Sequence, residues 1–526
     1  MKIHSTLFFS AVLGALGCTT PKESQHKTAS EVAFTHDYLP FYFADSPRVE
    51  RMKNVFPVIN KIYTDYAEKN HFPGMAFGLV ADGKLIYSNA IGFANIASKI
   101  PATIQTDFRI ASMTKSFTAM SILRLRDEGK LRLQDPVSNY IPEVAKIRYL
   151  TKDSAPITIE NLLTMSAGFP EDNPWGDRQL ENTDESLLAF VRDGISFSNV
   201  PGLNYEYSNL GFALLGRIVT IVSGKSYQRY ISENILGPLQ MNDTHWEFTQ
   251  IEKEKLALGY AWKDNQWMEE PLLHDGAFGA MGGLICSVKD FSKYLAFHLS
   301  AWPPRNEGES SVLKRSSLRE MQQLQRLGIF TPDNHNRSGM PCPVITGYGY
   351  GLGWRKDCSG IVCVRHGGGL PGFGSEWRFY PEYGIGVVAL SNLTYGGLGL
   401  ANAKVLDTLI LLARLKPRNL PLSSILAQRQ KEIVEVLPSW TPEKLGIFAK
   451  NFFLDKSLES RKQSTLKLLL EVGKIIKVKP IVPDNQLRGT FILEGEKMNV
   501  SVFFTLTPEN NPLIQQLDLS VIPRSN

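Results

Sequence analysis

The sequence predicts an α+β fold in which one antiparallel sheet, flanked by helices and a helical subdomain, is followed by a smaller α+β domain. Strand-like runs occur near both ends of residues 46–416, and a long helical region separates them. The simplest closure of this pattern is a single antiparallel sheet built from both ends, with helices on its faces. A change of pattern after residue 416 predicts the second domain.

The first elements are a hairpin and a helix. Two β-rich runs at 75–95 flank Asp82-Gly83, which is a strong hairpin signal. Residues 112–129 repeat apolar side chains at helical spacing. The pattern stops at Gly129, a residue that commonly ends helices.

The middle of the first domain is predicted to be helical, and its end is predicted to contain two strands and a helix. Residues 157–230 have a mostly helical pattern. Residues 375–392 form two strand-like runs around a Pro-Glu-Tyr-Gly turn, and a helical run follows at 400–415. This arrangement supplies the second group of strands for the predicted sheet.

A boundary is predicted at Lys416-Pro417, within the sequence KPRNLP. Helical patterns at 422–436 and 442–471 come next, and four β-type runs follow them. Residues 417–526 are therefore predicted to be an accessory α+β domain of ordinary domain size.

The composition excludes several classes of protein. Of 526 residues, 43% are hydrophobic and 21% are charged, which excludes a disordered or collagen-like chain. The formal charge of +5 is too small to require a nucleic-acid partner. Nine histidines and five cysteines, with no CxxC or HExxH string, predict no metal and no cofactor.

The N-terminus predicts export. The apolar run from Leu7 to Gly17 is too short to span a bilayer, and it fits a signal peptide at 1–17 followed by a polar tether at 18–45. The string Ala15-Leu16-Gly17-Cys18 resembles the lipobox of bacterial lipoproteins, which predicts lipidation of Cys18 and anchoring at the periplasmic or extracytoplasmic face of a membrane. The alternative is a plain signal peptide that contains a cysteine.

The other cysteines allow two interpretations. Cys358 and Cys363 flank a predicted turn at Ser359-Gly360, so a bridge across a hairpin is one alternative. The other is that each, like Cys286 and Cys342, is a packed free thiol.

The string Ser112-Met113-Thr114-Lys115 stands at the start of the helix predicted at 112–129. This spacing places a hydroxyl and an amine on one helical face. A serine becomes a good nucleophile when a neighbour accepts its proton, and a lysine can do so once burial or a second cation lowers its pKa. Taken alone, the string also fits an N-cap serine followed by a surface lysine.

Two further elements lie downstream. In Tyr207-Ser208-Asn209, the phenol can relay protons beside a lysine and the amide can hold a substrate carbonyl. His366 precedes three glycines just before the strand predicted at 375–380, where a substrate can lie against the strand edge. The glycines also match G-x-G-x-x-G, but a strand follows where a dinucleotide site needs a helix. In isolation, the tyrosine fits a packed aromatic and the histidine a structural residue.

In this order and spacing, the three elements resemble the serine β-lactamase and penicillin-binding superfamily, especially its class C β-lactamase, DD-peptidase and esterase branch. Three more stretches support the resemblance, which covers about residues 50–415. Residues 161–168 (NLLTMSAG) resemble the family's LLTHTSG, with Met165 in place of the usual histidine. Residues 235–241 resemble its PLGM segment, and residues 279–284 its glycine turn before a helix.

The resemblance implies a role for each matching position. Ser112 would be the acylated nucleophile, and Lys115 and Tyr207 would share proton transfer. Asn209 would contact substrate and Lys115. The resemblance places the substrate along His366, Gly367, Gly368 and Gly369, with the backbone N–H groups of Ser112 and Gly369 as the oxyanion hole.

His366 departs from the lysine of the β-lactamase KTG motif, so a fixed cation for an antibiotic carboxylate is missing. No acidic residue is evident beside the motifs. The prediction is an exported serine hydrolase for small esters, D-amino-acid amides or cell-wall peptides, with weak or no β-lactamase turnover. The alternative is a non-catalytic protein that binds peptidoglycan fragments or a protein partner.

Overall fold

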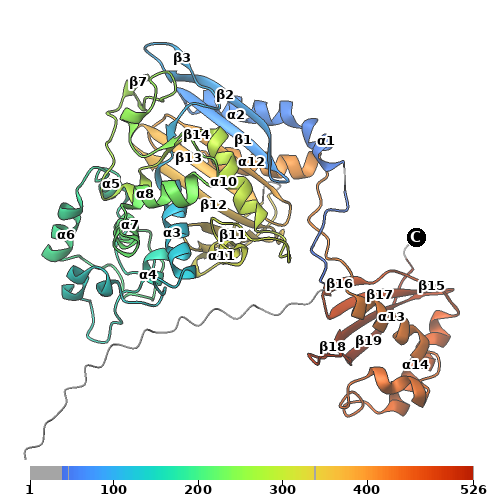
Figure 1. Ribbon diagram of the computed structural model, residues 1–526. Coiled ribbons are helices and arrows are strands. Elements are labelled where there is room, and N and C mark those ends of the chain that lie inside the picture. The colour runs from blue at the N-terminus through green and yellow to red at the C-terminus, as the bar shows by residue number, and fades with distance from the viewer. Residues whose placement is uncertain (1–37, 46, 337–338, 525–526) are drawn as a thin grey trace, which may run out of the picture. The chain divides into compact units, whose positions relative to one another are not determined.

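A computed structural model describes residues 38–45, 47–336 and 339–524. Its central feature is a nine-stranded sheet with the order β3-β2-β1-β14-β13-β12-β11-β10-β9, and every neighbouring pair is antiparallel (Figure 1). The strands are β1 (Gly74–Ala81), β2 (Lys84–Asn95), β3 (Ile100–Pro101), β9 (Arg326–Thr331), β10 (Val344–Tyr348), β11 (Gly353–Asp357), β12 (Val362–Leu370), β13 (Phe373–Tyr380) and β14 (Ile385–Ser391).

The sheet is assembled from both ends of the domain, as the sequence predicts. β1 and β2 form the predicted hairpin, whose turn residues Asp82 and Gly83 have φ of 49° and 76°. Positive φ at both positions suits the tight turn that joins twisted strands. β1 then pairs with β14, with Met75 opposite Ser391, so the first and last strands lie side by side at the centre (Figure 1).

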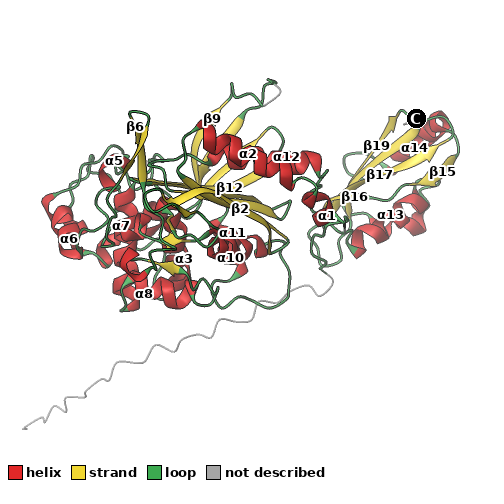
Figure 2. Ribbon diagram, turned by 90° about the horizontal axis from the view of Figure 1, so that it is seen from above, coloured by secondary structure: helices red, strands yellow, loops and turns green. Residues whose placement is uncertain are grey.

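Helices cover both faces of this sheet (Figures 1 and 2). Alternate residues of β1 point to opposite sides: Phe77 belongs to the core under one set of helices, and Ala76 to the core under the other. The first set is α1 (Arg48–Lys53), α2 (Phe56–Lys69) and α12 (Gly399–Leu412); the second includes α3 (Lys115–Asp127) and α10 (Val288–Ser300).

The region between the two groups of strands is largely helical, but most of its helices are short. Residues 169–182 are rich in Pro, Gly, Asn and Asp, which interrupt helices. The helices are α4 (Ile159–Leu163), α5 (Asn173–Gly176), α6 (Asp184–Asp193), α7 (Asn209–Ser223), α8 (Tyr227–Ile231), α9 (Gly279–Gly282) and α11 (Arg315–Met321). Small sheets pair β4 (Phe108–Arg109) and β5 (Thr244–His245) with β8 (Ile285–Cys286), and β6 (Tyr260–Lys263) with β7 (Gln266–Glu269).

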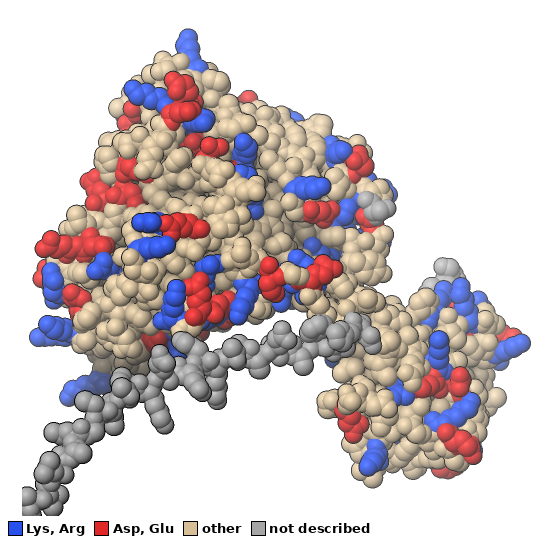
Figure 3. All heavy atoms as spheres, viewed as in Figure 1, with Lys and Arg blue, Asp and Glu red and all other residues tan. Residues whose placement is uncertain are grey.

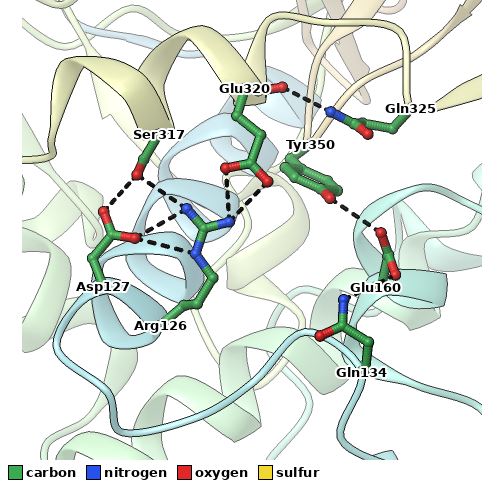
Figure 4. Close-up of polar contacts among 8 residues, drawn as sticks. All are labelled: Arg126, Asp127, Gln134, Glu160, Ser317, Glu320, Gln325 and Tyr350. Carbon is green, nitrogen blue, oxygen red and sulfur yellow. Dashed lines mark hydrogen bonds and ion pairs between the residues drawn. The ribbon is translucent and has the colours of Figure 1, made fainter. Parts of the chain in front are cut away.

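A polar network holds the C-terminal end of α3 (Figure 4). The Arg126 guanidinium donates to both carboxylate oxygens of Glu320 on α11, at 2.9 and 2.8 Å, and to Ser317. Nearby, the Tyr350 hydroxyl donates to Glu160 on α4 at 3.2 Å. One guanidinium nitrogen contacts both carboxylate oxygens. Hydrogen bonds between charged groups are stronger than neutral ones, so the helix that begins at Lys115 is held at its far end.

The C-terminal residues have their own sheet and hydrophobic core. The elements are α13 (Ser424–Val436), α14 (Leu458–Val472), β15 (Ile475–Val478), β16 (Val482–Asn485), β17 (Arg488–Gly495), β18 (Asn499–Leu506) and β19 (Ile514–Ile522). The helix predicted at 442–471 is only partly right. Residues 442–447 form a 3₁₀ turn, and α14 begins after Ser457, whose side chain caps the helix by accepting from the Ser460 N–H.

The bridge between Cys358 and Cys363, one of the two alternatives for these cysteines, is wrong. Cys358 is bonded to Cys342 instead, and Cys363 is a buried free thiol, as is Cys286. The strand register explains the choice. β12 places Cys363 opposite Arg355, whereas the pairing of Val344 with Asp357 brings the residues around Cys342 and Cys358 together.

The predicted signal peptide, most of the predicted tether and Cys18 lie outside the described residues. Among the described helices, none is long and apolar enough to cross a membrane. Within the same residues, no group of three or more His, Cys, Asp or Glu side chains is placed to hold a metal ion. On the face seen in Figure 3, basic and acidic side chains are interspersed.

Candidate active site

Ser112 lies in a tight turn that joins β4 to α3. Ala111–Thr114 form a 3₁₀ turn, and α3 begins directly at Lys115. Ala111 has φ of 50°, a left-handed conformation that is costly for a residue with a side chain. Ser112 is therefore presented on a constrained turn at the helix start, and 7% of its surface is exposed.

Lys115 is completely buried and has three oxygen partners. Its Nζ lies 3.0 Å from the Ser112 Oγ, 2.6 Å from the Asn209 Oδ1 and 2.8 Å from the Met281 carbonyl oxygen. Asn209 begins α7 and Met281 belongs to α9. Segments far apart in sequence thus fix the amine beside the serine hydroxyl.

Burial lowers the pKa of Lys115 to about 7, although the charges of Asp177 and Asp172 oppose the shift. A neutral amine has two N–H bonds and one lone pair. The two N–H groups can remain on the Asn209 Oδ1 and the Met281 carbonyl, which leaves the lone pair for the Ser112 proton. The geometry and the charge state both suit Lys115 to a general-base role.

Tyr207 completes this cluster from the segment before α7. Its hydroxyl is hydrogen-bonded to Ser112, and its ring centroid lies 4.9 Å from the Lys115 Nζ. Burial raises the pKa of Tyr207 well above its usual value. The phenol therefore keeps its proton at neutral pH and can pass it on only as another proton arrives.

The glycine run of β12 lies against the serine turn. A Cβ on Gly368 would stand 2.4 Å from both the Ile110 carbonyl oxygen and the Ser375 Oγ. A Cβ on Gly369 would stand 2.7 Å from the Tyr395 ring. A Cβ on Gly367 would meet nothing closer than 3.8 Å. The close approach of strand and turn therefore depends on Gly368 and Gly369, but not on Gly367.

We expect Gly368→Ala to destabilise the protein by about 1–3 kcal/mol, because the added methyl group has to displace the Ile110 backbone. Gly367→Ala is the matched control, since the same methyl group, one residue earlier in the same strand, makes only ordinary van der Waals contacts at 3.8 Å or more. Thermal unfolding of the two purified variants measures the difference. Equal melting temperatures would contradict the packing described here.

His366 is held neutral beside the cavity. Its Nε2 lies 2.8 Å from the Tyr348 hydroxyl and its Nδ1 lies 2.6 Å from the Gly367 carbonyl oxygen. Burial lowers the pKa of His366 to about 3, and the nearby charge of Lys115 adds to the shift. His366 therefore supplies hydrogen-bonding atoms and no fixed charge at neutral pH.

Ser112, Tyr207 and the edge of β12 line a cavity of about 420 Å³. The other lining residues include Arg365, Asp177 and Tyr395. The expectation that the site lacks a fixed cation needs correction, because Arg365, next to His366 in the strand, stands in the cavity wall. The expectation that no acidic residue lies beside the motifs needs correction as well, because Asp177 also lines the cavity.

The structure brings together Ser112, Lys115, Tyr207 and Asn209, and it places the 366–369 run along the cavity wall. Asn209 contacts Lys115 as expected, but it is fully buried and does not line the cavity. Its neighbour Asn173 does line the cavity. Asn173 accepts a hydrogen bond from the Asn209 Nδ2 at 3.1 Å. Cys18, the predicted lipidation site, lies outside the described residues.

The sequence profile of the beta-lactamase family matches residues 59–410. The fold, the match and the clustered motifs agree: this chain belongs to the beta-lactamase family, whose members are generally serine hydrolases or penicillin-binding proteins.

The chain is 29% identical over 341 residues to Protein flp of Staphylococcus aureus (strain N315), covering 64% of this chain and 62% of that protein. It therefore spans less than two thirds of the length of that relative. It is also 28% identical over 259 residues to Beta-lactamase-like protein 2 of Dictyostelium discoideum, covering 48% of this chain and 47% of that one.

The solved structures that share the fold include a penicillin-binding protein and a homologue of one. One is the octameric penicillin-binding protein homologue from Pyrococcus abyssi, with a TM-score of 0.56 and 23% identity; the match covers 88% of this chain and 98% of that one. The other is a penicillin-binding protein from Bacillus halodurans, with a TM-score of 0.52 and 23% identity over 66% of this chain and 98% of that one.

Proposed function

We propose that this chain is a serine hydrolase that forms an acyl-enzyme on Ser112 and cleaves esters or amides, D-amino-acid and cell-wall amides among them. The observation that carries the proposal is the position of the Lys115 Nζ, 3.0 Å from the Ser112 Oγ in a fully buried site. A surface lysine would stay protonated and could not accept the proton.

The proposed reaction has two halves. The Ser112 Oγ attacks the substrate carbonyl while its proton moves to Lys115, and the N–H groups of Ser112 and Gly369 stabilise the oxyanion. The bond between the acyl carbon and the leaving group then breaks. The leaving group takes a proton from Tyr207, which is reprotonated by Lys115. Water attacks the acyl-enzyme by the same route and restores Ser112.

The test is to label the purified protein with a fluorophosphonate or a penicillin probe and to map the modified peptide. The proposal expects the label on Ser112. A label on another serine would remove its basis.

The alternative is a non-catalytic protein that binds peptidoglycan fragments or a protein partner. The neutral-amine geometry of Lys115 argues against it, because a binding scaffold gains nothing from a buried lysine directed at a serine hydroxyl. Stoichiometric labelling without turnover of any ester or amide would favour this alternative.

We expect a short-chain p-nitrophenyl ester to be hydrolysed with a higher kcat/KM than a chromogenic cephalosporin, by about tenfold or more. The reason is that neutral His366 gives the cephalosporin carboxylate no charge to bind and leaves Arg365, one residue along the strand, as a cation in the cavity wall, whereas the ester has no carboxylate to satisfy. His366→Lys should raise the relative rate on the cephalosporin, and Arg365→Ala should lower it. A wild-type preference for the cephalosporin contradicts the expectation, and a ratio unchanged by His366→Lys shows that the histidine is not the cause.

We also propose that the protein is exported and anchored through Cys18, on the lipobox-like sequence that ends there. Cys18→Ser should move the protein from the membrane fraction to a soluble or uncleaved form, because several acyl chains are needed for stable anchoring. Fractionation followed by immunoblotting measures this. An unchanged distribution would refute the anchor.

A further inference from the structure

Positive charge is concentrated in one segment of the C-terminal domain. Residues 456–479 contain seven Lys or Arg against two Glu, a net charge of +5. The whole chain, with 57 Lys and Arg against 52 Asp and Glu, has the same net charge of +5, so the remaining residues are neutral on balance. The segment contains α14 and β15. Charge gathered in one segment attracts an anionic surface far more than the same charge spread over the chain.

The lysines of α14 are open to solvent. Lys462 and Lys467 of this helix and Lys474, in the turn after it, are exposed. Within the described part of the chain, none of the three forms an ion pair or a side-chain hydrogen bond. Lys479 differs, because it pairs with Glu494 at 2.7 Å. Three ammonium groups along and just after α14 are therefore available to a ligand.

The same helix exposes two leucines. Its buried side is marked by Thr465 and Val472, and Val472 belongs to the hydrophobic core of the domain. Leu466 and Leu470 are 46% and 78% exposed. They are four residues apart, so they lie on one face of the helix. The outer face of a helix on a globular domain is normally polar, so this apolar stripe is an exception and adds nothing to the core.

Lysines flank the leucine stripe. At 3.6 residues per turn, Lys462 lies about 40° to one side of Leu466. On the other side lie Leu470, at about 40°, and Lys467, at about 100°. Glu459 lies on the same face two turns earlier, in the first turn of α14, where an acidic residue is favourable. The C-terminal half of α14 is therefore apolar along the middle of its outer face and basic on both sides.

Basic residues from three segments lie around the end of this helix. Lys474 is in the turn to β15, Lys497 is in the turn between β17 and β18, and Arg524 follows β19; all three are exposed. The Lys497 N–H donates to the carbonyl of the last residue of α14 at 2.9 Å, and the Arg524 guanidinium donates to the Glu496 carbonyl at 2.8 Å. Glu471 and Glu496 are the acidic residues in these segments, so positive charge is in excess here.

We propose that this surface of the C-terminal domain docks on an anionic lipid bilayer. Leu466 and Leu470 would enter the boundary between headgroups and acyl chains, while the basic groups bind lipid phosphates. An apolar stripe with basic flanks is typical of helices that lie in a membrane interface. A soluble polyanion would pair with the lysines but gain nothing from the leucines, which favours a bilayer. The residues of this α14 surface are Lys462, Leu466, Lys467, Leu470, Lys474, Lys497 and Arg524.

The inference goes beyond the proposed hydrolase and depends on neither Ser112 nor the anchor at Cys18. Its test is vesicle binding by the chain without residues 1–17 and with Cys18→Ser, which excludes a lipid anchor. Co-sedimentation compares vesicles of phosphatidylcholine with vesicles in which about a third of the lipid is phosphatidylglycerol. Binding to the anionic vesicles should be about tenfold tighter or more, because each lysine near such a surface strengthens binding about fivefold. Salt at about 1 M should remove this difference.

Two double variants separate charge from apolar contact. Lys462→Gln with Lys467→Gln should weaken binding to the anionic vesicles by about ten- to thirtyfold. Leu466→Ser with Leu470→Ser should weaken it by about tenfold or more, because the apolar area that enters the interface is lost. All four side chains are exposed, so the melting temperature should stay at the value of the unsubstituted protein.

The matched controls are exposed residues of the first domain. Lys152→Gln with Lys253→Gln removes the same charge, and Leu400→Ser with Leu411→Ser removes the same apolar groups from α12. Both should bind vesicles as the unsubstituted protein does. A control that loses as much binding as its α14 counterpart would overturn the proposal, because the contact would then be unspecific.

Two further results would overturn it. Equal binding to neutral and anionic vesicles would show that the lysines do not contact the lipid. Loss of binding in the lysine variant with full binding in the leucine variant would assign the surface to soluble polyanions instead. Labelling of Ser112 by the serine probe is read separately on the same preparations, so failure of the bilayer surface and failure of the hydrolase proposal are distinguishable.

Discussion

Ser112→Ala is expected to lower ester turnover by about 10⁴-fold or more, because no other group in the cavity can form the acyl bond in its place. The fold should survive. The change removes one hydroxyl and the hydrogen bonds it shares with Lys115 and Tyr207, which costs about 1 kcal/mol. Steady-state kinetics with a p-nitrophenyl ester, together with thermal unfolding, measure both effects.

The matched control is Ser98→Ala, since Ser98 is exposed and alanine keeps the backbone N–H that donates to the Asn95 Oδ1 at 3.0 Å. It should retain wild-type turnover. If Ser112→Ala retains more than a few per cent of wild-type turnover with a normal melting temperature, the nucleophile is another residue.

Lys115→Met is expected to lower acylation by about 10²–10⁴-fold at pH 7, the range typical of a lost general base. In wild type the base is active only when unprotonated. Since burial lowers the pKa of Lys115 to about 7, acylation should rise as the pH increases through this value. The Met variant should lose this rise. Stopped-flow acylation rates across the pH range, measured for both proteins, provide the test.

The same substitution leaves the Asn209 Oδ1 and the Met281 carbonyl without their donor, so the melting temperature should also fall. Lys253→Met, at an exposed lysine, is the control for removing a positive charge and should match wild type in both measurements. A rise in rate with pH that persists in Lys115→Met would assign the base to another group.

The parts of the fold that could be predicted are those that a short stretch of neighbouring residues determines. Asp82-Gly83 marks the first hairpin because positive φ is needed at both positions. The motifs at Ser112 and Tyr207 could be found because their spacing within each segment carries chemistry. Their assembly around Lys115 could be predicted only through the family resemblance, since nothing local relates α3 to α7.

The rest could not be predicted because it depends on contacts between distant segments. Asp177 lies in a loop that is rich in Asp, Asn, Pro and Gly, and no spacing separates it from Asp172, which caps a helix. The partner of Cys358 depends on strand register rather than on closeness in sequence. The pKa of His366 follows from burial, which a single residue in a glycine-rich run does not reveal.

The pairing of β1 with β14 has a consequence for how the domain folds. Met75 meets Ser391 in the middle of the sheet, so the central contact closes a loop of most of the domain. Contacts so far apart in sequence make folding slow, because the entropy of the long loop is lost before the pairing compensates for it. During synthesis, β1 can pair with β2 on one side, but its other neighbour in the sheet, β14, is made only near the end of the domain. An eight-residue strand that is buried along its whole length is then an edge open to other chains. We therefore expect aggregation during folding, rather than loss of the folded state, to limit the yield of chains truncated before residue 385.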